Sequence, residues 1–297
     1  MKFSEFEYEA PATAAEAVRL LASRLGEAKL IAGGQSLLPT MAYRLAQPAL
    51  LVDVKNIPDL NRIAIGPDGV RLGARTRWRD IEDSAALCTA HPLLKEAIRH
   101  VAHYQIRNRG TVGGSLAHAD PASELPCIAV TCEAVIQVLG PQGERLVKAE
   151  DFFLGPLSTV LADDEMILEL RLPAWRDGRR WAFQEFSRRP GDFALAGIAL
   201  FYDLDAEGRV SNAHVGVVGA CQRSQRLAAA ENALNGKPLD AATIAAAAAA
   251  AREEADPTGD LHASAEYRKA LTGTLLERAL LQASGRQEGI TMEIDNA

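Results

Sequence analysis

The sequence has few of the residues that build metal centres. Only four of its 297 residues are cysteines, Cys88, Cys127, Cys132 and Cys221, and no two of them form a Cys-x-x-Cys pair. Metal and iron–sulfur sites need clustered ligands, whereas scattered cysteines in a reducing compartment behave as small buried hydrophobic residues. We therefore expect any metal or cluster that this protein works with to lie on another polypeptide.

A long apolar run and an excess of positive charge are also missing. No segment approaches the roughly 20 apolar residues that cross a bilayer, and the first residues lack the apolar stretch of a secretory signal. The formal net charge is −7 and the pI is about 5.5, whereas nucleic-acid binding requires a basic face. We expect a globular protein of the cytoplasm with no membrane span and no nucleic-acid partner. Local basic clusters are compatible with either solvated turns or an anion or docking site: Arg107, Arg109, Arg179, Arg180, Arg188 and Arg189.

Several fingerprints of enzymes and nucleotide sites are absent. The sequence contains neither Gly-x-Gly-x-x-Gly nor a Walker A motif, and it has no Gly-x-Ser-x-Gly. His100 and His103 share a face of an expected helix but have no third ligand nearby in sequence. Ser115, His118 and Asp120 are too close in sequence for a hydrolytic triad. We therefore expect no Rossmann or P-loop site, no metal ligand and no catalytic side chain.

Residues 1–175 read as an alternation of short apolar strands and helices. Thr13 and Glu16 have the spacing of a capping box, and the helix that they start ends at Gly26. Apolar runs bounded by glycine and proline indicate the strands. We expect strands over 29–32, 50–54, 63–65, 70–72, 134–139, 145–147 and 166–172, helices over 37–45, 92–104 and 122–131, and a loop over 105–115.

The polar, breaker-rich segment 173–180 indicates a domain boundary. Beyond it we expect an antiparallel sheet over 181–187, 194–204 and 210–218, followed by helices over 241–254 and 265–282. The sequence thus predicts an α+β protein with domains at 1–175 and 176–297.

Two double-glycine segments form the main candidate ligand site. Gly33-Gly34-Gln35-Ser36 stands between an expected strand and an expected helix, and Gly113-Gly114-Ser115 repeats the pattern. Two adjacent glycines let the backbone approach a ligand closely and adopt positive φ, and the free N–H groups can bind anionic oxygens. One such segment is as typical of a tight turn as of a phosphate site, but two suit a diphosphate held between them. Asp120 and Glu124 could accept hydrogen bonds from ribityl or ribose hydroxyls, or simply stabilise a helix N-terminus.

Four segments, in this order, resemble the FAD-binding (medium) subunit of the xanthine dehydrogenase and carbon monoxide dehydrogenase family of molybdenum hydroxylases. They are residues 32–37, 107–115, 119–124 and 187–192, and the resemblance extends over nearly the whole chain. It implies a two-subdomain FAD-binding domain of the vanillyl-alcohol oxidase (PCMH) type and a C-terminal domain of sheet and helices. It also implies FAD and electron transfer to an external acceptor, and we expect the FAD to be non-covalent because the sequence has paired glycine segments and no persuasive attachment residue. The implied partners are a small iron–sulfur subunit and a large molybdenum subunit in a dimer of heterotrimers.

Carried over residue by residue, the resemblance implies specific contacts with FAD. Val101 would pack against the adenine, Glu124 would meet the ribityl chain, and Ile167 would cover the cofactor. Gln184 stands where xanthine dehydrogenases have a lysine, and the loss of this cation means that an NAD-linked mechanism is not transferred. Gln35 stands where a histidine is common in carbon monoxide dehydrogenases, but either side chain can form a hydrogen bond, so FAD binding is still expected. The implied cofactor-binding residues are Leu30, Ile31, Ala32, Gly33, Gly34, Gln35, Ser36, Leu37, Val101, Gly110, Thr111, Val112, Gly113, Gly114, Ser115, Ser123, Glu124, Ile167 and Gln184.

Other interpretations stay open at this point. Phe193 could lie against the isoalloxazine ring, although a core position is the more usual one for an aromatic side chain. The chain could also be a self-sufficient flavin oxidase or reductase with its own substrate pocket. A scaffold whose glycine segments bind nothing is the third interpretation.

Overall fold

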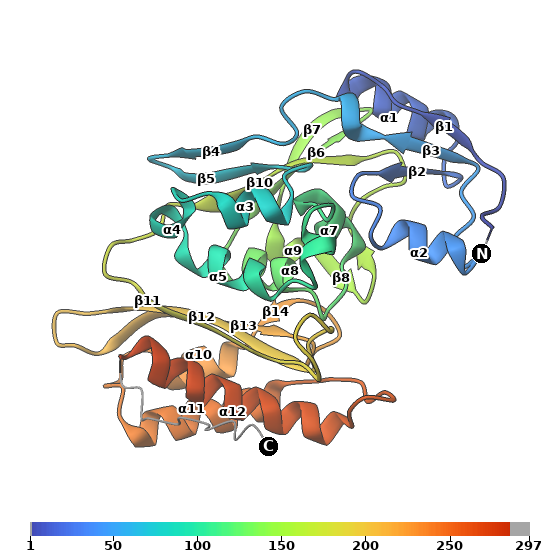
Figure 1. The fold of residues 1–297 in the computed structure, drawn as a ribbon. Coiled ribbons are helices and arrows are strands. Elements are labelled where there is room, and N and C mark those ends of the chain that lie inside the picture. The colour runs from blue at the N-terminus through green and yellow to red at the C-terminus, as the bar shows by residue number, and fades with distance from the viewer. Residues whose placement is uncertain (1, 286–297) are drawn as a thin grey trace, which may run out of the picture.

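The first layer of the molecule is a small parallel sheet with strand order β1-β3-β2 (Figure 1). The computed structural model describes residues 2–285, so the outer ends of the two predicted domains, Met1 and 286–297, lie outside the described residues. Thr13 caps the first helix by accepting a hydrogen bond from the Glu16 backbone N–H, as the capping box predicts. The elements are β1 (Glu7–Glu9), α1 (Ala14–Ser23), β2 (Ala28–Ile31), α2 (Leu37–Ala42), β3 (Leu50–Asp53) and the 3-10 helix η1 (Val54–Asn56).

The second sheet is antiparallel, with strand order β4-β5-β10-β6-β7. Both predicted hairpins are present in it, and β10 pairs between them. The strands are β4 (Ile63–Gly66), β5 (Gly69–Gly73), β6 (Val135–Gly140), β7 (Gly143–Lys148) and β10 (Met166–Pro173), and β8 (Phe153–Gly155) and β9 (Ser158–Thr159) form a separate pair.

A layer of short helices lies between the second sheet and a third sheet (Figure 1). One continuous apolar core extends from Leu170 on β10, through Leu94 and Ile128 on the helices, to Phe201 on the third sheet. The helices are α3 (Trp78–Asp83), α4 (Leu87–Ala90), α5 (Pro92–His100), α6 (Tyr104–Arg107), α7 (Val112–His118), α8 (Glu124–Thr131) and α9 (Ala149–Phe152).

The prediction of a loop over 105–115 is wrong for 105–107 and 112–115, which belong to α6 and α7, and holds for 108–111 between these helices. Thr111 caps α7 by accepting a hydrogen bond from the Gly114 N–H at 3.2 Å. Gly113 packs so closely on Ala74 that a Cβ at Gly113 would lie 2.7 Å from the Cβ of Ala74. Glycine disfavours a helix by propensity, but Gly113 lies in α7 because only a residue without a side chain can pack this closely on Ala74. This contact is distant in sequence, so the local sequence pattern does not reveal it.

The third sheet is antiparallel, with strand order β11-β12-β13-β14, and helices cover one of its faces. Its strands are β11 (Arg180–Phe186), β12 (Ala196–Leu204), β13 (Val210–Val218) and β14 (Gln225–Arg226), and its helices are α10 (Ala228–Leu234), α11 (Ala241–Glu254) and α12 (Ala265–Ala283). The α+β class and the C-terminal sheet with helices are thus confirmed, whereas the division at residues 175 and 176 stays a prediction. Within residues 2–285, no helix has the length and apolar character that a membrane span needs.

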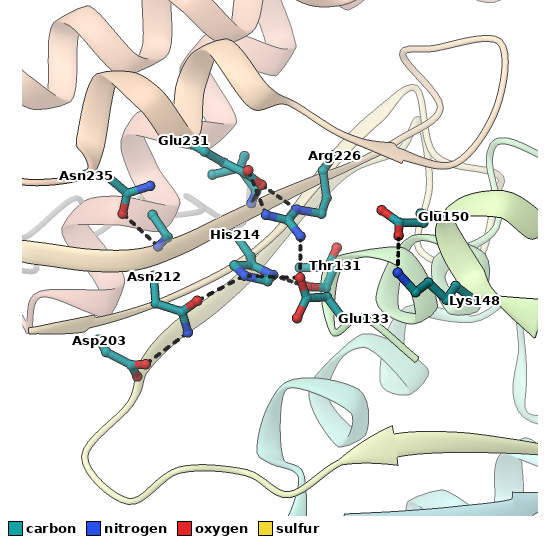
Figure 2. A network of polar contacts seen from close by, with 12 residues as sticks. Thr131, Glu133, Lys148, Glu150, Asp203, Asn212, His214, Arg226, Glu231 and Asn235 are labelled. Atoms are coloured by element: carbon teal, nitrogen blue, oxygen red, sulfur yellow. Dashed lines mark hydrogen bonds and ion pairs between the residues drawn. The ribbon is translucent and has the colours of Figure 1, made fainter. Parts of the chain in front are cut away.

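A polar network joins the end of α8 to the third sheet (Figure 2). The buried His214 on β13 places Nδ1 2.8 Å from the carbonyl oxygen of Thr131. Arg226 forms ion pairs with Glu231 at 2.7 Å and with Glu133 at 2.9 Å. These contacts fix the position of α8, whose first residue is one of the candidate cofactor contacts.

Candidate cofactor site

The structure brings the two glycine segments together. A Cβ at Gly33 would lie 2.2 Å from the carbonyl oxygen of Arg109 and 3.0 Å from the Cα of Gly110, so only glycine allows this approach. Gly34 has a φ of +73°, as the sequence predicts for a glycine turn. Gln35 closes the turn by donating from Nε2 to the carbonyl oxygen of Gly33 at 3.0 Å.

A cavity of about 230 Å³ opens where these segments meet. Its basic side chains come from three separate parts of the chain, and its lining residues are Ala32, Asp53, Lys55, Arg75, Arg77, Arg109 and Thr111. Nε of Arg75 is buried and has no hydrogen-bond partner among the described residues. The one acidic side chain, Asp53, already accepts a hydrogen bond from Tyr8 at 2.6 Å.

Both the positive charge of this cavity and the backbone geometry of the glycine segments beside it therefore suit an anionic ligand. None of Arg75, Arg77 and Arg109 forms an ion pair with a carboxylate of the described residues. Guanidinium groups without a protein carboxylate suit phosphate oxygens, which they bind through paired N–H donors. These residues fit the diphosphate of FAD.

Three of the four cations in this cavity were not singled out by the sequence pattern. Lys55, Arg75 and Arg77 lie far in sequence from both glycine segments, and only Arg109 lies inside one of them. One local signal was available, because Arg75 and Arg77 flank the fully buried Thr76 directly after a strand. Two residues at positions i and i+2 of an extended segment point to the same side, so the sequence indicates that Arg75 and Arg77 share a face. It does not indicate which ligand or part of the protein that face contacts.

Two predicted contacts, Ala32 and Thr111, line this cavity, and the others lie on several elements of the fold. Leu30 and Ile31 end β2, and residues 32–36 connect β2 to α2. Ile167 is buried on β10. Val101 follows α5, and its carbonyl oxygen accepts a hydrogen bond from Nη1 of Arg107 at 3.1 Å. Their assignment as FAD contacts stays a prediction.

Glu124 is a buried acid at the first position of α8, directly after Ser123. Burial raises the pKa of the Glu124 carboxyl to about 7, and the charge of Asp120 adds to this rise. Asp120 itself accepts a hydrogen bond from the Ala122 N–H at 2.9 Å. This bond supports the interpretation of Asp120 as a residue that stabilises the turn before α8.

Gln184 is separated from the other candidates by the third sheet. Its Nε2 donates to Oε1 of Gln282 on α12 at 2.6 Å, so the side chain faces the helix-covered side. The structure brings the next residue, Glu185, to the opposite face, where burial, and to a smaller extent the charge of Glu124, raises the pKa of Glu185. The predicted role of Gln184 stays untested, and Glu185 is a residue that the sequence pattern did not single out.

Several side chains that stood apart in the sequence have structural partners. Arg107 forms an ion pair with Glu82 at 3.1 Å, and Arg179 forms one with Asp203 at 3.0 Å. Phe193 is 72% exposed, so the core interpretation of this aromatic is wrong, and its contact with the isoalloxazine ring stays a prediction. Among the described residues, no group of three or more His, Cys, Asp and Glu side chains is placed to hold a metal.

Comparison with known families divides the chain into two matched parts. Residues 4–175 match the FAD binding domain in molybdopterin dehydrogenase, and residues 181–283 match the CO dehydrogenase flavoprotein C-terminal domain. The nicotine 6-hydroxylase medium subunit of Paenarthrobacter nicotinovorans is 40% identical over 96% of this chain and 100% of that protein. The carbon monoxide dehydrogenase medium chain of Hydrogenophaga pseudoflava is 38% identical over 95% of this chain and 98% of that protein.

Solved structures of related proteins superpose on nearly the whole chain. A chain of carbon monoxide dehydrogenase from Hydrogenophaga pseudoflava superposes with a TM-score of 0.93 at 40% identity, over 97% of this chain and 100% of that one. Quinoline 2-oxidoreductase from Pseudomonas putida 86 gives a TM-score of 0.91 at 35% identity, with the same coverage of both chains. The resemblance seen in the sequence is confirmed, and with it FAD as the cofactor. The chain belongs to the family of FAD-binding medium subunits of the molybdenum hydroxylases.

Proposed function

We propose that this chain holds one FAD non-covalently and links the redox centres of two partner subunits to an external electron acceptor. The partners are a small iron–sulfur subunit and a large molybdenum subunit that oxidises an organic substrate, assembled as a dimer of heterotrimers in the cytoplasm. The observation that carries this proposal is the basic cavity between the two glycine segments. Relatives described as medium subunits or medium chains of hydroxylases and dehydrogenases support it.

The residues of this chain have distinct roles in the proposal. Arg75, Arg77 and Arg109 bind the diphosphate, and Gly33 allows the two backbone segments to enclose it. Glu124 meets the ribityl chain. Bound FAD supplies the redox chemistry, and the protein supplies binding, orientation and electrostatics.

Further parts of the proposal concern the same cofactor. Val101 packs against the adenine and Ile167 covers the ring system. The domain that binds FAD extends over 1–175, and residues 176–297 form the C-terminal flavin-subunit domain. Because no side chain is required to transfer a proton, the proposal includes no catalytic residue.

The role as a subunit is tested by producing the full chain with and without its genomic neighbours and comparing substrate-dependent dye reduction. We expect the chain alone to bind FAD but to reduce no dye, and the assembly to contain iron, molybdenum and FAD and to reduce it. Reduction at catalytic rates by the isolated, metal-free chain would contradict the proposal and favour a self-sufficient flavin oxidase.

The diphosphate role is tested separately with Arg75→Ala and Arg109→Ala. Each should weaken FAD binding roughly tenfold or more, because a charged hydrogen bond contributes about 1.5–3 kcal/mol. Arg19→Ala is the matched control, since Arg19 is exposed on α1 and lies outside the cavity. Equal FAD affinity in all three variants would contradict the assignment of the cavity.

A further inference from the structure

Glu185 is a half-buried acid, and one of its two carboxyl oxygens is buried and unsatisfied. Its Oε2 is buried and has no hydrogen-bond partner among the described residues. It forms no ion pair with a described cation, whereas most buried carboxylates in proteins are paired. A buried acceptor without a partner destabilises the folded state, because it has lost its hydrogen bonds to water. The fold therefore retains at this position a side chain that destabilises it.

The strand register fixes the direction in which Glu185 points. On β11, Gln184 pairs with Ile198 and Glu185 with Gly197, so the two side chains point to opposite faces. Ile198 belongs to the core beneath the covering helices, whereas Phe183, on the same face as Glu185, belongs to the core shared with α5 and α8. Glu185 thus faces the FAD-binding domain.

A cavity of about 330 Å³ lies in front of Glu185. His100 lines it from the end of α5 and His103 from the position before α6. Gly191 closes it from the turn after β11, where a Cβ would lie 2.4 Å from the imidazole of His103. The arginines of this cavity are engaged elsewhere, Arg107 with Glu82 at 3.1 Å and Arg99 with Glu96 at 3.2 Å. No described cation therefore neutralises Glu185.

A second acid, Glu124, lies near enough to Glu185 to affect its charge. Burial raises the pKa of the Glu185 carboxyl to about 9, and the negative charge of Glu124 adds to this rise. A raised pKa favours the protonated carboxyl, in which one oxygen can donate a hydrogen bond while the other accepts one. The polar edge of a flavin and its ribityl hydroxyls offer both donors and acceptors.

We propose that Glu185 is a further FAD-binding residue, whose buried carboxyl forms a direct hydrogen bond with the cofactor next to Glu124. This inference rests on the proposed function, in which the ribityl chain of FAD lies at Glu124. The bound cofactor supplies the partner that Oε2 lacks in the protein alone. The cost of burying the acid is then offset only when FAD is present, which is the behaviour of a binding residue rather than of a structural one.

The experiment compares two properties of the full chain for each variant: the unfolding free energy without FAD, and the dissociation constant of FAD in titration. Glu185→Leu should weaken FAD binding roughly tenfold or more, while the stability of the FAD-free chain stays equal or rises. Glu185→Gln should stay within about threefold of the wild type, because an amide also donates and accepts. The opposite direction of the two effects is the signature of a cofactor contact.

Glu231→Leu is the matched control, because Glu231 is a buried acid whose partners are all in the protein. It accepts hydrogen bonds from the Val215 N–H at 2.9 Å and from Arg226 at 2.7 Å. We expect this variant to lose stability and to keep the FAD affinity of its folded fraction. Were Glu185 structural, Glu185→Leu would behave in the same way.

Unchanged FAD affinity in Glu185→Leu overturns the proposal. If this variant does not fold, Glu185→Met, which is unbranched and similar in length, takes its place, and failure of both apolar variants to fold also overturns the proposal. A wild-type chain that binds no FAD contradicts the proposed function itself, and this inference with it.

Discussion

Gly33 gives the strongest single test of how the two glycine segments form the site. In Gly33→Ala the new Cβ would lie 2.2 Å from the carbonyl oxygen of Arg109 and 2.8 Å from its carbonyl carbon. Both atoms belong to the backbone, so no side-chain rotation relieves the clash, and the segments must separate by about 1 Å to reach van der Waals contact. Such overpacking costs about 1–3 kcal/mol. Because the cavity lies between these segments, its arginines move apart as well.

We expect Gly33→Ala to lower the unfolding free energy of the FAD-free chain by about 1–3 kcal/mol and to weaken FAD binding at least ~10-fold. Chemical denaturation and FAD titration measure the two effects. Gly66→Ala is the control, because a Cβ at Gly66 meets nothing within 4 Å. If Gly33→Ala matched Gly66→Ala in both measurements, the close approach of the segments would have no role in forming the site.

Three further predictions concern the glycine segments, the buried His91 and the ion pair of Arg226. Gly34→Val and Gly114→Val should each lose FAD while circular dichroism shows most secondary structure intact. A β-branched residue at Gly34, where φ is +73°, is strained by ~1–3 kcal/mol, and a Cβ at Gly114 would lie 2.9 Å from Oγ1 of Thr111. Full FAD occupancy in both variants would show that these segments are ordinary turns. Burial lowers the pKa of His91 from 6.5 to about 3, so the unfolded chain binds this proton more tightly than the folded chain. The unfolding free energy is therefore highest above pH 6.5 and is about 2 kcal/mol lower at pH 5. Chemical denaturation of His91→Asn at the two pH values should not show this loss. Arg226→Ala should destabilise the chain by about 3–5 kcal/mol, because it leaves Glu231 buried without its cation; a melting temperature equal to the wild type would contradict this.

Local signals in the sequence were sufficient for most of the elements. The Thr13 and Glu16 capping box and the apolar runs that form β6 and β10 are contained in short windows, and the structure has these elements in place. The start of α7 is not predicted from the sequence, because glycine lowers helix propensity and the residue on which Gly113 packs is the distant Ala74. A contact between residues so distant in sequence leaves no trace in a local pattern.

The candidate site likewise contains residues that the sequence identifies and residues that only the folded structure brings together. Its glycine segments are recognisable as motifs, but the cations Lys55, Arg75 and Arg77 reach the cavity from parts of the chain that no motif connects. The contrast between Gln184 and Glu185 depends on strand parity: a single step in register exchanges the face toward α12 for the face toward Glu124. Only the packed sheet shows which of the two lies near Glu124.

The central claim is that the basic cavity between the glycine segments holds the diphosphate of a non-covalent FAD. The most direct measurement is to denature the purified chain and identify the flavin that remains in solution by chromatography. The account predicts intact FAD in the soluble fraction and none attached to the polypeptide. Recovery of FMN, which has no diphosphate, or of flavin still attached to the denatured chain would contradict it.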